Sequence, residues 1–202
     1  MVQLFVDGGG FMWPILFIFI IGFVFVGERL YHLVKGLASN EDFAMEVSST
    51  LEKSGAKAAQ EMCDQSMGPV ANLCSSALEK ADSGVEAVEK TLDQSGTIEM
   101  ASMEKNMTWI SLCIATAPML GFLGTVWGMI QAFNDIKMAN DISPAVVAGG
   151  ISVALLTTAF GLVVAVVLQI LQNAVMYIID NQIVTLQKSS IMILEAVEKK
   201  KK

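Results

Sequence analysis

Long stretches of this 202-residue sequence carry no charged residue at all. Asp, Glu, Lys and Arg together make up only 16% of the chain, against about 25% in an average soluble domain. Hydrophobic residues make up 53%, and the mean hydropathy is +0.56. So little charge beside so many apolar residues excludes an ordinary soluble domain. We therefore predict an all-α membrane protein.

The chain is also poor in residues that perform chemistry. It has one histidine, and its three cysteines, Cys63, Cys74 and Cys113, lack metal-ligand spacing, so we interpret them as reduced thiols without a role. The run Gly8-Gly9-Gly10 resembles a phosphate loop only superficially, because the lysine is missing, and we interpret it as a flexible lead into the first helix. We predict no catalytic residue, no cofactor and no metal site, and thus no enzyme.

Charge is concentrated in one block. Residues 28–109 hold 14 acidic and 7 basic residues, whereas the rest of the chain holds 6 of each. An acidic block argues against nucleic acid as a partner, because phosphate binding requires clustered Lys and Arg. We expect short helices here that pack on cytoplasmic extensions of the membrane helices, because so small a block cannot form a large core alone. Their predicted breaks are Ser54-Gly55, Gly68-Pro69, Ser83-Gly84 and Ser95-Gly96.

The first apolar stretch, residues 11–27, is uncharged over 17 residues, close to the shortest length that spans a bilayer. A cleaved signal peptide would have positive charge before the apolar run and small residues after it. Here Asp7 precedes the run, and Glu28 and Arg29 follow it. We therefore predict that the stretch is retained as a membrane helix.

The distribution of Lys and Arg predicts the orientation. The block after the first span carries 7 and the C-terminal tail 5, whereas the loop after the second span carries only Lys137. The positive-inside rule places the two basic parts in the cytoplasm. In chain order we predict a periplasmic N-terminus (1–10), the first span (11–27), a cytoplasmic helical region (28–109), the second span (110–133), a short periplasmic loop (134–143), the third span (144–172) and a cytoplasmic helical tail (173–202).

The third helix is longer than a membrane requires. Residues 145–179 contain no charge, and as a helix they would extend about 50 Å, beyond a hydrocarbon core of about 30 Å. The helix should continue into the cytoplasm, with Gln169, Gln172 and Asn173 near the inner boundary. The lysines at 199–202 suit an anchor to anionic membrane lipid.

Small residues recur every three or four positions on the second and third spans, so each helix has one face suited to close packing. No Asp, Glu, Lys, Arg or His lies in any of the three predicted spans. An ion that crosses beside the threonines must therefore use a carboxylate from another polypeptide. The alternative for each threonine is a hydrogen bond within its own helix, with no role in transport. The small and hydroxyl residues are Gly121, Gly124, Thr125 and Gly128, then Gly150, Ala154, Thr157, Thr158, Gly161 and Ala165.

Two of these stretches resemble a known family. Residues 117–130, APMLGFLGTVWGMI, and residues 154–165, ALLTTAFGLVVA, are similar to the ExbB/TolQ/MotA family of ion-driven motor subunits. The Glu28-Arg29-Leu30 exit from the first span and the three-span layout extend the resemblance. The length and the number of spans favour the ExbB/TolQ branch. The acidic block hardly takes part in the resemblance.

The resemblance implies a homopentamer in the bacterial inner membrane, built around a central pore. Inside it would lie a dimer of ExbD/TolR-like single-span subunits whose membrane Asp carries the ion, and a TonB/TolA-like protein would receive the work. By position, Thr125 and Thr158 match the hydroxyl residues that face the pore, and Thr157 adds another. The residues expected to pack around the partner are Gly121, Gly124, Gly128, Gly161 and Ala165.

Two departures from the family pattern leave alternatives open. Many relatives have a Glu shortly before the second threonine, where this chain has Ser152-Val153, and a Pro after the stretch that ends at Ala165, where this chain continues as Val166-Val167. Without that Glu the driving ion is undecided: we favour protons, and sodium is the alternative. A passive membrane scaffold, whose small residues serve assembly alone, is the hypothesis from another class.

Overall fold

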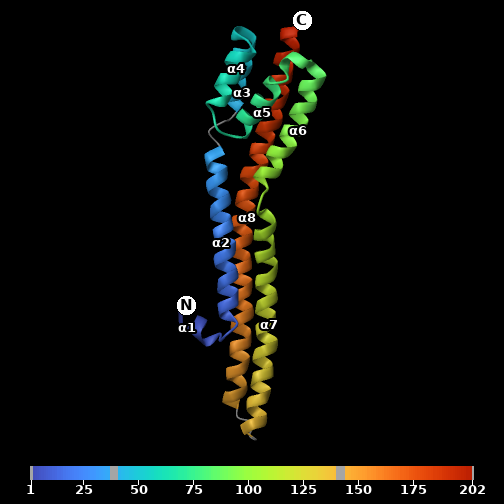
Figure 1. Cartoon of the computed structure of the whole chain (residues 1–202). Helices are drawn as coiled ribbons and strands as arrows, with labels where there is room; N and C mark the ends of the chain where they lie inside the picture. The colour runs from blue at the N-terminus through green and yellow to red at the C-terminus, as the bar shows by residue number, and fades with distance from the viewer. Residues whose placement is uncertain (1, 37–40, 140–143, 202) are drawn as a thin grey trace. The chain divides into compact units, whose positions relative to one another are not determined.

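A computed structural model describes residues 2–36, 41–139 and 144–201, and every regular element in these ranges is a helix, which confirms the predicted all-α class. The elements in chain order (Figure 1) are α1 (Val2–Asp7), α2 (Met12–Gly36), α3 (Glu41–Ser54), α4 (Ala56–Asp64), α5 (Pro69–Leu78), the 3-10 helix η1 (Ala81–Ser83), α6 (Val85–Met103), α7 (Met107–Ala139) and α8 (Pro144–Lys201).

Three segments of the described chain are long and apolar enough to cross a membrane, and they lie within Met12–Val34, Val85–Met138 and Val147–Lys199. They correspond to α2, α7 and α8, so the membrane class is confirmed. The 58 residues of α8 form one unbroken helix about 85 Å long, far longer than a hydrocarbon core. The third helix therefore extends beyond its predicted span. Residues 134–139 of the predicted 134–143 loop belong to α7, and the remainder lies outside the described residues.

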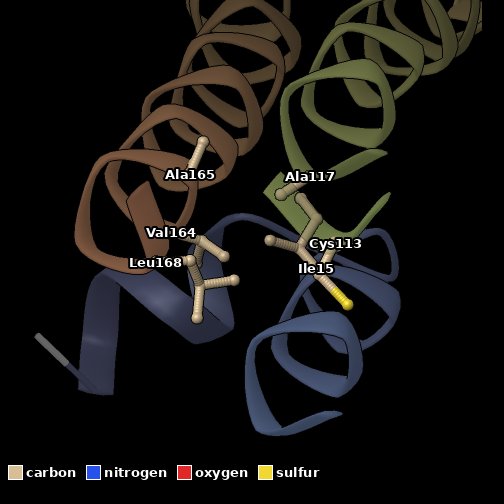
Figure 2. Close-up of a cluster of buried hydrophobic side chains, with 6 residues drawn as sticks. All are labelled: Ile15, Cys113, Ala117, Val164, Ala165 and Leu168. Carbon is tan, nitrogen blue, oxygen red and sulfur yellow. The ribbon is translucent and has the colours of Figure 1, made fainter. Parts of the chain in front are cut away.

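The chain divides into two compact units. Unit 1 comprises Met1–Glu28 and Asn106–Ala174, and unit 2 comprises Arg29–Lys105 and Val175–Lys202. In unit 1 the three apolar helices share a buried cluster, to which α2 contributes Ile15. Figure 2 shows the side chains from the three helices converging there. The members of the cluster are Ile15, Cys113, Ala117, Val164, Ala165 and Leu168.

The N-terminus of unit 1 differs from the flexible lead that the glycine run predicts. The short helix α1 precedes an ordered turn, in which the amides of Gly8 and Gly9 donate hydrogen bonds to carbonyls of α1. Gly9 has a φ of 73°, a left-handed conformation that glycine adopts without steric cost. The ring of Phe5 packs edge-on against Trp13 and Phe160, with centroids 5.4 and 5.8 Å apart. The aromatic contacts hold the turn against α2 and α8.

Unit 2 consists of α3 to α6 together with the ends of α2 and α8. Gly55, Gly68 and Gly84 all have positive φ at helix boundaries, which confirms three of the four predicted breaks. The fourth, at Ser95-Gly96, is wrong, because α6 runs unbroken through it. A glycine inside a helix costs only about 1 kcal/mol. Burial of Val88 and Leu92 on the face of α6 offsets this cost.

The core of unit 2 shows why the acidic block folds. Buried apolar side chains come both from its short helices and from the last part of α8, as expected for helices that share a core with a membrane helix extension. Most of the described charged side chains of unit 2 are exposed, and Arg29, which is 5% exposed, is an exception. The largest fully buried members are Val47, Leu51, Val70, Leu73, Val88, Ile179, Leu186 and Ile193.

Gln182→Leu is expected to lower the stability of unit 2. The Gln182 side chain is 8% exposed, and its amide donates a hydrogen bond of 3.0 Å to the carbonyl of Leu33. Leu33 is among the last four residues of α2, whose carbonyls lack a donor within the helix. Loss of the donor should reduce the unfolding free energy by about 1–2 kcal/mol. A thermal melt of the purified protein, with the exposed Gln187→Leu as control, measures this; equal melting temperatures would contradict it.

Candidate functional site

The small faces of α7 and α8 lie against each other within unit 1. At Gly121 an added Cβ would lie 3.0 Å from the carbonyl oxygen of Thr157 and 3.1 Å from the Cα of Thr158. At Gly161 it would lie 2.6 Å from the carbonyl oxygen of Ala117. Only glycine permits such an approach of two helix backbones. Because the two backbones are so close, Thr157 and Thr158 of α8 lie directly against α7.

The same contact continues along both helices in antiparallel register. A Cβ at Gly124 would lie 2.6 Å from Thr157 Oγ1, and one at Gly128 would lie 3.2 Å from the Cβ of Ala154. Ala165, the fifth small residue expected to pack around a partner, is buried in the three-helix cluster instead. These small residues thus contact one another or neighbouring helices within the chain. Their packing around a partner helix remains a prediction.

The hydroxyl groups of Thr157 and Thr158 converge on one backbone oxygen. Thr158 Oγ1 donates to the carbonyl of Gly121 at 3.1 Å. Thr157, which is 1% exposed, donates to Ala154 O at 2.8 Å and lies 3.4 Å from Gly121 O. Each hydroxyl has a single proton, and that proton is engaged by a backbone carbonyl. What remains on each oxygen is the ability to accept a hydrogen bond or to bind a cation.

Thr125 lies at the same level but is oriented differently. Thr125 follows Gly124, which faces Thr157 of α8. Measured along the axis of α7, Thr125 therefore lies within about one helical turn of the level of Thr157 and Thr158. Thr125 is half-buried, and its hydroxyl donates to the carbonyl of Phe122 in its own helix. The structure therefore brings Thr157 and Thr158 together on Gly121. Thr125 stands beside them as a separate group.

A cavity of about 400 Å³ adjoins this contact within unit 1. Thr157 and Gln131 are its polar lining residues, and Val153 lies 3.5 Å from the position of a Cβ at Gly9. The sequence offered no signal for this cavity, because one wall is the N-terminal glycine turn, whose position depends on tertiary contacts. The lining residues are Gly8, Gly9, Gly10, Phe11, Pro14, Gly124, Trp127, Gly128, Gln131, Val153 and Thr157.

A polar network joins α7 and α8 farther along unit 1. Gln172 Nε2 donates to Ser111 Oγ at 2.6 Å, and Gln169 Nε2 donates to Asn173 Oδ1 at 3.1 Å. These amides are the ones that the sequence placed near the inner membrane boundary. Ser111 was missed, because a single serine in an apolar helix gives no pattern. Exposed amides on helices of this kind require water or a polar partner.

Comparison with known proteins gives matches over most of the chain. A model of the MotA/TolQ/ExbB proton channel family matches residues 65–188, more than half of the sequence. A putative biopolymer transport protein ExbB homolog from Methanothermobacter thermautotrophicus is 33% identical over 183 residues, which cover 90% of this chain and 65% of that protein.

Shorter matches come from bacterial proteins. The biopolymer transport protein ExbB of Xanthomonas campestris pv. campestris is 41% identical over 81 residues, which cover 40% of this chain and 32% of that protein. The protein of the same name from Neisseria gonorrhoeae is 43% identical over 67 residues, covering 33% of this chain and 30% of its own length. The chain thus spans less than two thirds of the length of each of these relatives.

Proposed function

The chain belongs to the MotA/TolQ/ExbB proton channel family, and we propose that it is the channel subunit of a motor that converts the proton motive force into mechanical work for transport or envelope function across the periplasm. The observation that carries this proposal is the pair of hydroxyls, Thr157 and Thr158, within hydrogen-bond distance of Gly121 O between the charge-free spans of α7 and α8. A helix contact that is lined by hydroxyls and lacks charged residues suits the passage of a proton carried by a partner group better than the binding of a charged substrate.

The titrating acid must come from a second protein, because the predicted spans contain no Asp, Glu, Lys, Arg or His. We assign it to an ExbD/TolR-like subunit with one span and a membrane Asp. This chain would surround a dimer of that subunit as a homopentamer in the inner membrane, with its N-terminus in the periplasm. A TonB/TolA-like protein would receive the work.

The hydrogen-bond pattern suggests how the threonines act. Because the Thr158 proton is held by Gly121 O, its oxygen can accept a hydrogen bond from a protonated carboxylic acid but has no second proton to donate to a carboxylate. The neutral acid would therefore be held at the threonines and the anion released. Such a difference in affinity is what couples proton transfer to a change in position. Proton loss would move the partner helix.

Sodium is the alternative driving ion. Hydroxyl oxygens beside a partner carboxylate supply the hard ligands that such a cation prefers, and Val153 contributes no carboxylate of its own. Sodium would be carried if flux followed its gradient at constant pH.

A passive scaffold is the second candidate, and the close glycine contacts favour it. The contacts of Gly121, Gly124 and Gly161 account for these small residues as packing within the chain. The scaffold predicts assembly without ion flux. The channel hypothesis predicts both assembly and ion flux.

Ion flux into liposomes separates these possibilities. The chain is copurified with an ExbD/TolR-like single-span protein coexpressed from the same organism and reconstituted, and a pH gradient is imposed with potassium as the only alkali cation. We expect proton uptake that disappears when the membrane Asp of the partner is changed to Asn. Flux only with sodium present would select sodium, and assembly without any flux would select the scaffold.

A further inference from the structure

Two of the three cysteines lie in contact within unit 2. Cys63 is in the last turn of α4 and Cys74 is in the middle of α5, and both are unbonded thiols, 2% and 0% exposed. A hydrogen bond joins their side chains. Their separation of 11 positions gave no sign of this pairing.

Neighbouring hydrogen bonds fix the two helices in register at this point. Gln60 Nε2 donates to Ser75 Oγ at 2.8 Å, and Ser75 Oγ donates to Asp64 Oδ1 at 3.4 Å. Gln60 and Asp64 flank Cys63 on α4, and Ser75 follows Cys74 on α5. The contact between the thiols thus belongs to a set of side-chain contacts along the two helices.

The pair is chemically asymmetric. The pKa of Cys63 is lowered because the Cys74 thiol donates a hydrogen bond to its thiolate, although burial and the charge of Asp64 oppose this. The pKa of Cys74 is raised because it donates that hydrogen bond and because it is buried. Cys63 is therefore the nucleophile, and Cys74 keeps its proton.

We propose that Cys63 and Cys74 form a redox modification site that closes to a reversible disulfide when the protein meets a peroxide. The Cys63 thiolate attacks one peroxide oxygen, which gives a sulfenic acid and hydroxide as the O–O bond breaks. Cys74 then attacks the sulfenic sulfur, an S–S bond forms, and the leaving hydroxyl departs as water. Two thiols and one hydrogen peroxide thus give one disulfide and two waters.

The oxidant reaches Cys63 through local opening. Cys63 is one residue from the C-terminal end of the 9-residue helix α4, and the ends of short helices open more readily than helix interiors. The chain that follows is open to solvent, since Met67 is 77% exposed. A closed disulfide would tie α4 to α5 across the turn at Gly68, so that this part of unit 2 could no longer open.

Mass spectrometry tests the proposal directly. Trypsin cleaves after Lys57 and Lys80 and leaves both cysteines on one peptide, 58–80, together with Met62 and Met67, which fragmentation of the peptide distinguishes. The purified protein is treated with hydrogen peroxide, alkylated under denaturing conditions and digested. We expect a peptide two hydrogens lighter than the dithiol form, unalkylated, and restored by dithiothreitol, while Cys113 stays alkylatable.

Single variants identify the order of steps. In Cys74→Ser the sulfenic acid on Cys63 should persist and be trapped by dimedone, whereas in Cys63→Ser the remaining thiol should stay unreactive. Conversion of Met67 to its sulfoxide shows that the oxidant was sufficient. If Met67 is oxidised while both thiols of the native protein remain alkylatable, or if Cys63 pairs with Cys113 or another copy, the proposal is overturned.

Discussion

Thr158→Val is expected to reduce partner-dependent proton flux about 10- to 100-fold while the oligomer stays assembled. The substitution keeps the shape of the side chain but removes the oxygen that we assign to the partner acid and the bond to Gly121 O. Without that oxygen the O–H of the neutral acid is left unsatisfied at membrane depth, which costs about 1–3 kcal/mol and corresponds to roughly that range of rates. Energised transport in the cell should be abolished.

Thr158→Ser is the matched control, because it restores the hydroxyl in a smaller side chain. We expect most of the flux to return in this variant, and Thr158→Ala to behave like Thr158→Val. Flux in reconstituted liposomes and size-exclusion profiles measure activity and assembly separately. Normal flux in both the Val and Ala variants would remove the threonine from the ion pathway.

Gly161→Leu is expected to break the contact between α7 and α8. A Cβ at Gly161 would lie 2.6 Å from the backbone oxygen of Ala117, and a backbone atom cannot move aside without shifting its helix. Overpacking of this kind costs about 1–3 kcal/mol, occasionally more, so we expect a lower melting temperature and loss of the oligomer.

Gly149→Leu serves as its control on the same helix. A Cβ there would meet no atom within 4 Å, and leucine is a better helix former than glycine. This variant should assemble and melt like the native protein. If Gly161→Leu melts and assembles like Gly149→Leu, the helix contact described here is wrong. If glycine variants abolish assembly and threonine variants change nothing, the scaffold hypothesis is favoured.

Composition and periodicity were sufficient to predict the three apolar helices of unit 1, although not the short helix α1. Charge-free runs identify α2, α7 and α8, because every backbone polar group in lipid must be paired within its own segment. The recurrence of small residues identifies the faces on which α7 and α8 meet, because side chains three or four apart share a face. Charge-free runs and small-residue spacing depend only on residues close together in the sequence, so they can be recognised in a single sequence.

The sequence did not predict the orientation of individual side chains or the contacts between residues far apart in the chain. Spacing does not show that Thr157 and Thr158 share Gly121 O while Thr125 bonds within its own helix, because that depends on the rotamer of each side chain. The ordered glycine turn after α1 depends on the packing of Phe5 against Phe160, far away in the chain. Cys63 and Cys74 are adjacent only because α4 and α5 pack together.

A structure of this chain copurified with its single-span partner tests the central claim most directly. The quantity to measure is the distance from Thr158 Oγ1 to the membrane carboxyl group of the partner. We predict a companion helix enclosed by copies of this chain, with its acid within hydrogen-bond reach of that oxygen. Threonines that face lipid, with no companion helix at the centre of the assembly, would contradict the account.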